Sequence, residues 1–478
     1  MKKNIFKLAL VASATTFLGL YSCTDDFLDV DSKEDIAIID QESVHPEKFL
    51  NGTYGMFTEW DFAFSWLGVT EIISDNADKG SSASDNGGDK RDLDELVHNS
   101  TTGSVEAMWS RFYKTIGRAS NTIKYSEESS IIDQATKDQY IGEAKFLRAL
   151  SYFYLVRMFG DVTIQDINDE STNTIRKPKE EVYAYIEADL LDAIQKLPLK
   201  SQYPAKDLGR ATKGAAQSLL AKVYLYEKKY QQAYDMATTV VNSGQYNLEP
   251  NYATTWRAET ENGQESIFEI QARGVAPAHG VQQYSETQGA RGTSGWGWGF
   301  NTPSQNLLDA FNAEGDVIRR DATIIFRGET LYDGRVVSTA VENPMYNEKA
   351  YSSANAGSAD GDKNIRVIRF SEVLLIQSEA ANELGLDAYT PLNRVRNRVN
   401  LSPLTGLSKD QLRTKIWNER RLELAFEHDR WFDLVRTGQA KAMMTLNGKT
   451  FIEGKHELFP IPNAQLIQTP SMTQNPGW

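Results

Sequence analysis

The spacing of apolar residues predicts a chain that is made mainly of helices. In residues 139–159 the apolar side chains recur at helical intervals, which places them on one helix face. That face is formed by Tyr140, Ala144, Leu147, Tyr154 and Met158. Residues 178–197 predict another helix, because a proline stands near the start and Pro198 ends it. A helix is also expected from Pro46 onward, where the folded part of the chain begins.

Residues 210–244 predict a helical hairpin of the tetratricopeptide type. Small residues such as Ala221 allow two helices to approach, and large residues such as Tyr224 fill the space between them. Residues 370–384 and 391–399 predict a further pair of helices. Repeats of this kind bury their core by stacking pair upon pair, so we expect a scaffold of about four helical pairs.

Two stretches lack helical periodicity. Residues 247–364 are rich in Gly, Thr, Ser and aromatic residues and contain short apolar runs such as ESIFEIQ, which indicates loops with a few short strands. Residues 74–99 are dense in Gly, Ser and Asp and predict a long loop. Long irregular segments in a compact domain are usually functional or disordered. The expected fold class is therefore mostly α, with a tetratricopeptide-like scaffold of helical pairs and a large loop-rich insert at about 247–364.

A face that mixes apolar and charged residues is predicted near the C-terminus, in the segment NERRLELAFEHDRWFDLVRTG. On a helix the apolar residues fall within an arc of about 120°, and three glutamates share that arc. The apolar residues are Leu412, Ile416, Leu422 and Phe426, and the glutamates are Glu419, Glu423 and Glu427. Buried charge is tolerated only when it is paired, so the carboxylates are expected beside arginines such as Arg420, Arg421 or Arg430. A metal site or an acid–base cluster is the alternative, but no histidine lies at ligand spacing on this arc.

The N-terminus reads as an export signal. The segment MKKNIFKLALVASATTFLGLYSC begins with basic residues, continues with an apolar run, and ends with small residues before Cys23. It is too short and wrongly flanked for a membrane span. Its LYSC ending resembles a bacterial lipobox, and Cys23 is the only cysteine, although an ordinary signal with an incidental cysteine is the alternative. We therefore expect a lipoprotein signal peptide over 1–22, lipidation at Cys23, an acidic tether over 23–45 and a single domain over 46–478.

The charge of the chain narrows the classes of ligand. The net charge is −14. The only charged residues of the signal segment are lysines, so the chain without that segment is more acidic still. Nucleic-acid binding is not expected, because nothing supplies the basic field that phosphate contacts need. An acidic surface suits a neutral ligand, such as an uncharged sugar, better than a polyanion.

Three segments together resemble one protein family. They are NERRLELAFEHDRWFDLVRTG and LFPIPNAQLIQTPSMTQNPGW near the C-terminus, and GEAKFLRALSYFYLVRMFGDV in the helix predicted at 139–159. They resemble the hallmarks of the SusD/RagB family, which consists of surface glycan-binding lipoproteins of Bacteroidetes-type bacteria. The resemblance implies a lipid-anchored protein of the outer membrane that faces the cell exterior. It also implies a role in capturing oligo- or polysaccharide and delivering it to a SusC-like TonB-dependent transporter.

The candidate ligand-binding residues are aromatic side chains in the two irregular stretches. A sugar is held when flat aromatic rings lie against its C–H faces, and tryptophan is the best such surface. Trp296 and Trp298 stand among glycines, and in an extended segment both indoles would point to the same side. Trp66 and Tyr284 are further candidates. The resemblance supports this interpretation, because relatives bind glycans through aromatic residues in these regions, although inward anchoring of the glycine-rich loop is the alternative for Trp296 and Trp298.

Polar partners for sugar hydroxyls are expected in the loop at 74–99, although a solvated loop is the alternative. The candidates are Asp75, Asn76, Asp78, Lys79 and Arg91. Two short runs have the oxygen-rich composition of calcium sites, but solvated turns are the expected interpretation of both, and no cofactor is expected. The runs consist of Asp85, Asn86 and Asp89, and of Asp360, Asp362 and Asn364.

A binding protein is favoured over an enzyme. The sequence shows no nucleophile elbow, phosphate loop or zinc signature, and it has only five histidines. A glycoside hydrolase needs two carboxylates at a set separation. The chain has many acidic residues, so their presence alone does not decide whether it is such an enzyme. Two alternatives remain beside glycan capture: a peptide-binding RagB-like nutrient-uptake protein, and a structural lid of the transporter with little affinity for a ligand.

Overall fold

The computed structural model describes residues 45–82, 84–85, 87–169, 171, 174–274, 280–352 and 361–478. Residues 46–128 and 132–478 form one compact unit, to which the helices and strands named below belong. The predicted signal segment, Cys23 and the tether up to residue 44 lie outside the described residues.

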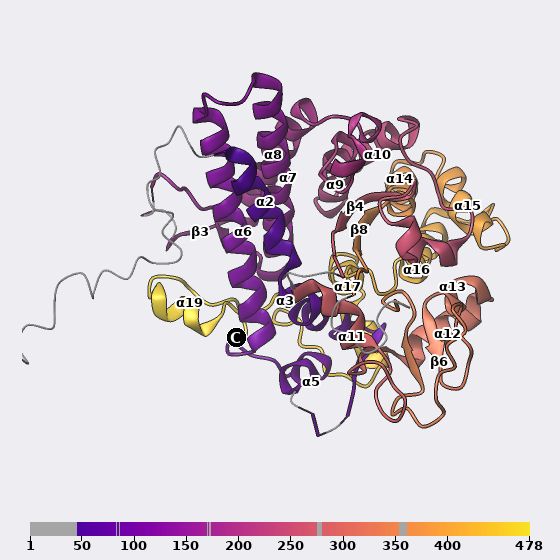
Figure 1. Cartoon of the computed structure of the whole chain (residues 1–478). Coiled ribbons are helices and arrows are strands. Elements are labelled where there is room, and N and C mark those ends of the chain that lie inside the picture. Colours follow the sequence, from indigo (N-terminus) through magenta and orange to yellow (C-terminus); the bar gives the residue numbers. More distant parts are fainter. Residues whose placement is uncertain are drawn as a thin grey trace, which may run out of the picture. The chain divides into compact units, whose positions relative to one another are not determined.

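A succession of packed helices forms the scaffold, as the sequence predicts. Each helix packs against its neighbour in this succession, with α14 contacting α10, α15 and α16 (Figure 1). The helices are α6 (Gly103–Glu128), α7 (Gln134–Phe159), α8 (Lys179–Lys196), α9 (Lys213–Tyr226), α10 (Tyr230–Asn242), α14 (Phe370–Leu384), α15 (Tyr389–Arg398) and α16 (Lys409–Glu423). The fold class predicted from the sequence, a mostly α tetratricopeptide-like scaffold, is confirmed.

The ends of these helices follow from capping residues. The Asp133 carboxylate accepts a hydrogen bond from the Thr136 N–H, and the Thr212 hydroxyl accepts one from Ala215, so each satisfies a free donor at a helix start. Gly385 ends α14 in the left-handed conformation that glycine adopts without strain. Because Asp133 caps α7, this helix starts five residues earlier than the apolar spacing predicts.

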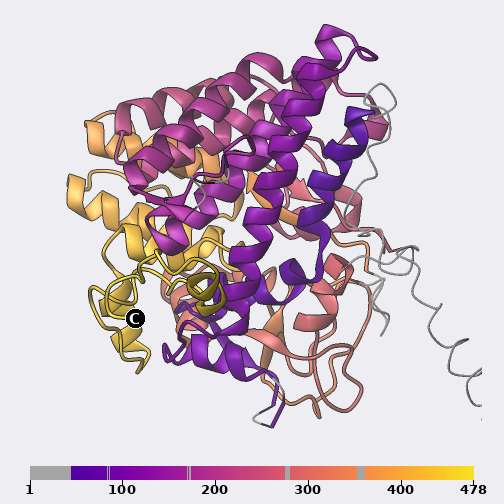
Figure 2. The same ribbon diagram turned by 90° about the vertical axis from the view of Figure 1, so that its left-hand side faces the viewer.

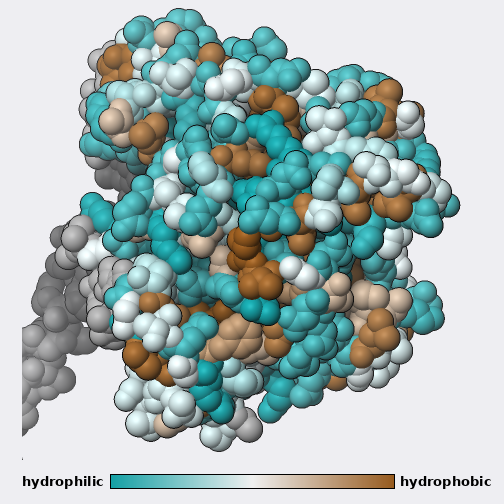
Figure 3. All heavy atoms as spheres, turned by 90° about the vertical axis from the view of Figure 1, so that its right-hand side faces the viewer, coloured by the Kyte–Doolittle hydropathy of each residue, from teal (hydrophilic) through white to brown (hydrophobic). Residues whose placement is uncertain are grey.

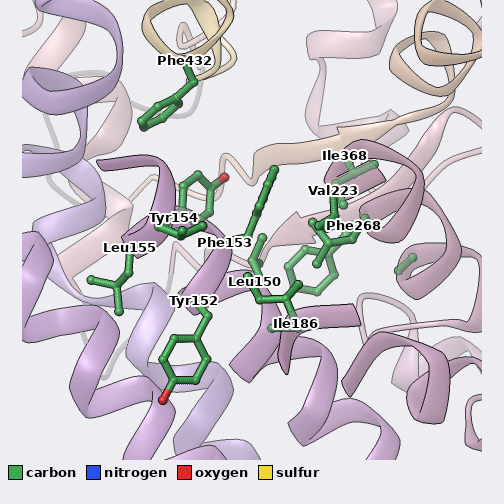
Figure 4. Packing of buried hydrophobic residues seen from close by; sticks show 14 of the residues in the cluster. Leu150, Tyr152, Phe153, Tyr154, Leu155, Ile186, Val223, Phe268, Ile368 and Phe432 are labelled. Carbon is green, nitrogen blue, oxygen red and sulfur yellow. The ribbon is translucent and has the colours of Figure 1, made fainter. Parts of the chain in front are cut away.

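Helix α7 is the centre of the core. The sequence predicts one apolar face, but from Tyr140 to Phe159 almost every side chain is buried. The reason is that α6 and α8 cover two sides of α7, and a helix that is enclosed on all sides has to be apolar all round. Figure 4 shows part of this core. It labels Leu150, Tyr152, Phe153, Tyr154 and Leu155 of α7 with Ile186 of α8, Val223 of α9, Phe268, Ile368 and Phe432.

The strands are short and form four antiparallel pairs within the described residues. The pairs are β1 (Ala77–Gly80) with β5 (Phe300–Pro303), β2 (Val162–Thr163) with β3 (Arg176–Lys177), β4 (Ser266–Ile270) with β8 (Ile365–Arg369), and β6 (Ile324–Phe326) with β7 (Met345–Asn347). The pairing of β1 with β5 joins the stretch at 74–99 directly to the insert. Much of the insert lies below α9, α10 and α14 in Figures 1 and 2, while its strand β4 lies beside α9.

Both irregular stretches are more ordered than the sequence predicts. The first contains β1 and α5 (Gly88–Asp94), and the insert contains α11 (Tyr284–Gln288), α12 (Gln305–Glu314) and α13 (Val317–Asp321). Helix α12 has no clear apolar periodicity, because it buries only Leu307 and Phe311. Its start nevertheless has a readable signal, since the Ser304 hydroxyl accepts a hydrogen bond from the Leu307 N–H.

The remaining helices frame the N- and C-terminal parts of the unit. They are α2 (Pro46–Gly55), α3 (Trp60–Ala63), α4 (Ser65–Leu67), α17 (Arg430–Arg436), α18 (Ala440–Leu446) and α19 (Asn463–Gln468). A π-helical turn over Gly68–Ile72 follows α4 directly. No helix in the described part of the chain combines the length and the apolar character that crossing a bilayer requires. The face in Figure 3 is mostly hydrophilic, with hydrophobic side chains gathered in a few groups.

The prediction of one continuous helix through the C-terminal segment is wrong beyond Glu423. There α16 ends, and Phe426 and His428 adopt positive φ values of 63° and 69°. Such values are costly for residues with side chains and persist where the surroundings compensate. Here the His428 N–H donates to the buried carboxylate of Glu71. The break separates α16 from α17 and turns Glu427 toward a buried arginine, Arg369.

The three glutamates of this segment are buried, as predicted, but their partners come from elsewhere in the chain. Arg369 Nη1 lies 2.6 Å from Glu423 Oε1, Arg319 Nη1 lies 3.0 Å from Glu423 Oε2, and Arg398 pairs with the same carboxylate. Glu419 pairs with Arg319 and Arg396, and Glu427 with Lys349 and Arg369. The predicted arginines have other partners: Arg420 pairs with Asp433, while Arg421 and Arg430 pair with Asp75. The partners differ from those predicted because tertiary packing, rather than helical spacing, brings the guanidinium groups to these glutamates.

Glu71, in the π-helical turn, is expected to make stability depend on pH. Burial raises its pKa to about 8 from a usual value of 4.5, and Oε2 has no hydrogen-bond partner among the described residues. The folded protein therefore holds a proton that the unfolded chain releases above pH 4.5, and the free energy of unfolding falls between pH 4.5 and 8. Glu71→Gln removes this loss, so we expect it to stabilise the protein by roughly 3 kcal/mol at pH 7 and by little at pH 4.5.

The measurement is urea unfolding of both proteins at pH 4.5, 7 and 8. Glu106→Gln, at an exposed position, is the matched control and should show no such trend. A stability difference between wild type and Glu71→Gln that is the same at all three pH values would contradict the prediction.

Candidate functional site

Trp66 is a core residue in this structure. Its side chain is 2% exposed and packs edge-to-face against Phe112 and Tyr154, with ring centroids at 5.8 and 4.5 Å. The ring of His428 lies 5.5 Å away on another side. The indole that the sequence predicts as a ligand contact is thus enclosed by protein and presents no open face to a sugar.

Asp75 and Asn76, the predicted partners for sugar hydroxyls, are also enclosed. Arg430 holds both carboxylate oxygens of Asp75 at 2.7 Å, and Arg421 Nη2 lies 3.1 Å from Asp75 Oδ2. Burial alone would raise the pKa of Asp75, but Arg430 and then Arg421 outweigh it and lower the pKa to about 2. Asn76 Oδ1 accepts from Arg421. In this structure the two residues anchor β1 to the C-terminal segment.

Tyr284 and Trp296 are likewise turned inward. The Tyr284 hydroxyl lies 3.0 Å from His428 Nε2, and its ring is 5% exposed. The indole of Trp296 is 7% exposed and packs on Tyr351, with the guanidinium of Arg335 at 4.9 Å from its ring. For Trp296 this geometry matches the inward anchoring that the sequence left open as the alternative.

Trp298 is the predicted ligand residue that remains partly exposed. Its ring lies 5.6 Å from that of Trp60 and 6.2 Å from that of Phe64, and Trp60 stacks on Phe64 at 5.4 Å. All three side chains are only partly buried. We call these three residues the aromatic platform. Trp296 and Trp298 therefore do not share one face, because the segment that carries them is folded back rather than extended.

The backbone of the insert fixes the position of Trp298. Its N–H donates to the Glu286 carbonyl at 2.9 Å, and the N–H groups of Trp296 and Gly297 both donate to the Ala290 carbonyl. A Cβ at Gly297 would lie 2.3 Å from the Glu286 carbonyl oxygen, so only glycine allows this close approach. The glycines of the segment thus serve to fold the loop tightly beneath the indole.

The β1–β5 pair and a buried lysine support the platform from behind. Phe300 of β5 contacts Phe64 edge-to-face at 5.0 Å. Lys90 is 1% exposed, lies 3.8 Å from the centre of the Phe64 ring, and donates to Asp89 and Ser104. A desolvated cation over an aromatic face is worth up to about 2 kcal/mol, so Lys90 helps to hold Phe64 in place.

Sequence reasoning missed Trp60 and Phe64. Helical spacing indicates that Trp60 belongs to the core, and it does not single out Phe64. Helix α3 is only four residues long, so the two rings stack at its end beside the insert rather than under a long helix. Their i, i+4 spacing was a usable signal for stacking, but nothing in the sequence shows that Trp298 comes to lie beside them.

The charges around the platform are largely compensated. Arg111 pairs with Asp61 at 2.8 Å, and Lys79 pairs with Asp85 at 2.9 Å. The platform therefore presents partly exposed rings beside ion-paired groups, an arrangement that suits a neutral ligand with C–H faces and hydroxyl groups.

Gly280 is expected to be essential for the shape of the platform. A Cβ at this position would lie 1.9 Å from the backbone nitrogen of Trp60 and 2.2 Å from its Cα. Gly280→Ala must therefore displace α3, and we expect it to lower the free energy of unfolding by about 1–3 kcal/mol and to change the near-ultraviolet circular dichroism of the tryptophans. Gly103→Ala is the control, since nothing lies within 4 Å of its added methyl group. Equal behaviour of the two variants would contradict the prediction.

The two runs considered for calcium are engaged in other contacts where they are described. Asp85 accepts from Lys79 and from the Gly87 N–H, and Asn364 donates to Glu269. Asn86 and Asp360 lie outside the described residues. Among the described residues no group of three or more His, Cys, Asp or Glu side chains is placed to hold a metal ion. The expectation that no cofactor binds stays a prediction, which melting curves with calcium and with a chelator check.

Two family models match the two ends of the chain. Residues 342–478 match the model of the SusD family, and residues 26–225 match a model described as starch-binding associating with outer membrane. The chain is 29% identical over 474 residues to SusD-like protein P2 of Formosa agariphila. That alignment covers 90% of this chain and 91% of the relative. It is 26% identical over 407 residues to the starch-binding protein SusD of Bacteroides thetaiotaomicron, at 70% and 72% coverage.

A solved structure shows the same fold over nearly the whole chain. The laminarin binding SusD-like protein superposes with a TM-score of 0.78 at 28% identity and covers 91% of this chain and 99% of its own. The resemblance that the three sequence segments indicate is thereby confirmed.

Proposed function

Because this chain resembles SusD-like proteins over nearly its whole length, we propose that it binds a glycan on the aromatic platform of Trp60, Phe64 and Trp298. The observation that carries the proposal is the partial exposure of these three neighbouring rings where the insert meets the N-terminal part of the unit. The laminarin-binding and starch-binding proteins to which the chain is similar support this class of ligand.

The physical argument concerns the faces of a sugar ring. A pyranose presents C–H groups on its faces, which lose little by leaving water when they lie on an indole. Rings held by packing and by backbone hydrogen bonds have little conformational freedom left to lose on binding. The ion pairs beside the platform leave no excess of positive charge that would favour a polyanion, so the proposed ligand is a neutral polysaccharide.

The test is affinity electrophoresis of the soluble chain, starting after Cys23, in gels cast with laminarin, starch and other neutral polysaccharides. Retardation by at least one of them is expected, with bovine serum albumin as the non-binding reference. Unretarded migration in every gel would sink the proposal and favour the peptide-binding or lid alternatives.

The proposed setting of this activity is the outer membrane. We infer that Cys23 is lipidated, that the protein faces the cell exterior, and that it hands its glycan to a SusC-like TonB-dependent transporter. The lipobox-like LYSC ending and the outer-membrane description of the matched model support this setting.

Fractionation of cells that express the tagged full chain tests the setting. Wild type is expected in the outer membrane, accessible to added protease and co-purifying with a TonB-dependent barrel, whereas Cys23→Ser should leave the membrane fraction. Protection of wild type from protease in intact cells would count against the outward orientation. Purification without a barrel would count against the transporter partner.

A further inference from the structure

We propose that the protein has a second carbohydrate site, on the helical scaffold, which takes neutral pyranose units of the same glycan. This inference rests on the proposed function. The site is a cavity of about 300 Å³ between the α9–α10 turn, α14, α16 and the end of α17. Helices α10, α14 and α16 lie next to one another in Figure 1. Volumes of this order are typical of small-ligand pockets.

Three aromatic side chains form walls of this cavity: Tyr226, Tyr230 and Trp417, all of them partly exposed. The indole N–H of Trp417 donates to Glu379 Oε1 at 3.0 Å, which fixes the orientation of the ring. The guanidinium of Arg436 lies 5.4 Å from the Tyr226 ring. The cavity therefore offers held aromatic surfaces, the same feature that makes the platform suitable for a sugar.

Two arginine–carboxylate pairs supply the polar part of the cavity. Arg436 holds both oxygens of Glu379, at 2.6 and 2.8 Å, and Arg413 holds both oxygens of Glu383. Bidentate pairs are rigid, and their opposite charges cancel. Glu379 Oε2 and Glu383 Oε1 each accept one hydrogen bond from these pairs and keep lone-pair capacity for a hydroxyl donor. Burial and then the carboxylates of Glu383 and Glu379 raise the pKa of Tyr230, because its hydroxyl lies near both. The lining, which also includes Lys228 and Thr437, thus offers donors and acceptors for hydroxyl groups.

A neighbouring cavity gives room for more than one sugar unit. It measures about 650 Å³ and shares Tyr226 and Arg436 with the first, and Tyr183 and Phe432 are among its other walls. The two cavities are thus adjacent along the helical scaffold. No lining residue of either belongs to the aromatic platform, so a long polysaccharide would contact the protein at two independent places. Two linked contacts hold a polymer more tightly than either contact alone.

The experiment is isothermal titration of the soluble chain with maltoheptaose and with laminarihexaose, using wild type, Trp298→Ala, Tyr230→Ala and the double variant. Tyr230 is chosen because it lines the cavity without holding a buried charge. Tyr234→Ala is the matched control, since Tyr234 lies one turn further along α10 and does not line the cavity. Melting temperatures of all variants verify folding.

We expect Trp298→Ala to retain a weaker binding event, and addition of Tyr230→Ala to weaken that remaining event about tenfold or more. Tyr234→Ala should leave it unchanged. If Trp298→Ala abolishes all binding, the second site is overturned while the proposed function stands. If Trp298→Ala has no effect and Tyr230→Ala removes the binding, the platform fails while the second site stands. Absence of binding to both probes in wild type overturns the second site for glucans.

Discussion

Trp298→Ala is expected to weaken glycan binding on the aromatic platform by about 30-fold, which corresponds to about 2 kcal/mol. The substitution removes the indole face on which we propose that the sugar lies, and it also leaves Trp60 and Phe64 without the ring that packs 5.6 and 6.2 Å from them. Because Trp298 is partly exposed and lies in a loop held by backbone hydrogen bonds, the free energy of unfolding should fall by no more than about 1 kcal/mol.

The measurement is affinity electrophoresis in a series of gels with increasing polysaccharide, together with a thermal melt of each variant. Tyr332→Ala is the control, since Tyr332 is an aromatic residue of the same insert that is 49% exposed and lies outside the platform. Trp298→Phe, which keeps a smaller ring, should fall between wild type and Trp298→Ala. Undiminished retardation of Trp298→Ala would remove the platform from the binding site. A large loss of stability instead would assign Trp298 to the core.

Glu423→Ala is expected to lower the free energy of unfolding by about 3–5 kcal/mol, the largest stability effect that we predict. Glu423 is fully buried and pairs with Arg369, Arg398 and Arg319. These arginines come from the end of β8, from α15 and from α13, so one carboxylate ties three elements to α16. Its removal leaves guanidinium groups in the interior without enough negative charge to balance them.

The sign of the pH dependence follows from the pKa of Glu423. Burial alone would raise this pKa, but Arg398, Arg369 and Arg319 outweigh burial and hold it well below its usual value of 4.5. The stabilisation is therefore complete above pH 4.5 and is lost as the pH falls toward the folded-state pKa. Urea unfolding should show a gap between wild type and Glu423→Ala that is constant from pH 6 to 8 and narrows below about pH 4.

Glu453→Ala is the matched control for the buried network. Glu453 pairs with Lys441, and both side chains are more than half exposed, at 64% and 58%, so its loss should change stability by less than about 1 kcal/mol. A change of that small size for Glu423→Ala would mean that the network contributes little beyond the hydrophobic core. A gap that widened in acid would contradict the sign derived from the pKa.

The helices could be predicted from the sequence alone because the signals that specify them are local. Capping residues, prolines at helix starts and small residues between large ones act over a few positions, so the expected ranges at 178–197, 210–244 and 370–384 agree with α8, the α9–α10 hairpin and α14. The resemblance to SusD-like proteins followed from three long motifs that can be read without any structure. The burial of Glu419 and Glu423 also followed from their positions on a helix, whereas Glu427 is buried although it lies beyond the end of α16.

The tertiary structure decided which residues meet. The sequence contains Trp60, Phe64 and Trp298 but not their contact, which depends on the pairing of β1 with β5 and on a glycine loop folded beneath the indole. It indicates that the glutamates of α16 are buried, but it does not indicate that Arg319, Arg369 and Arg398 are their partners. Local spacing predicts the type of element and the face that is buried, whereas contacts between residues far apart in the chain depend on packing that no short window of sequence encodes.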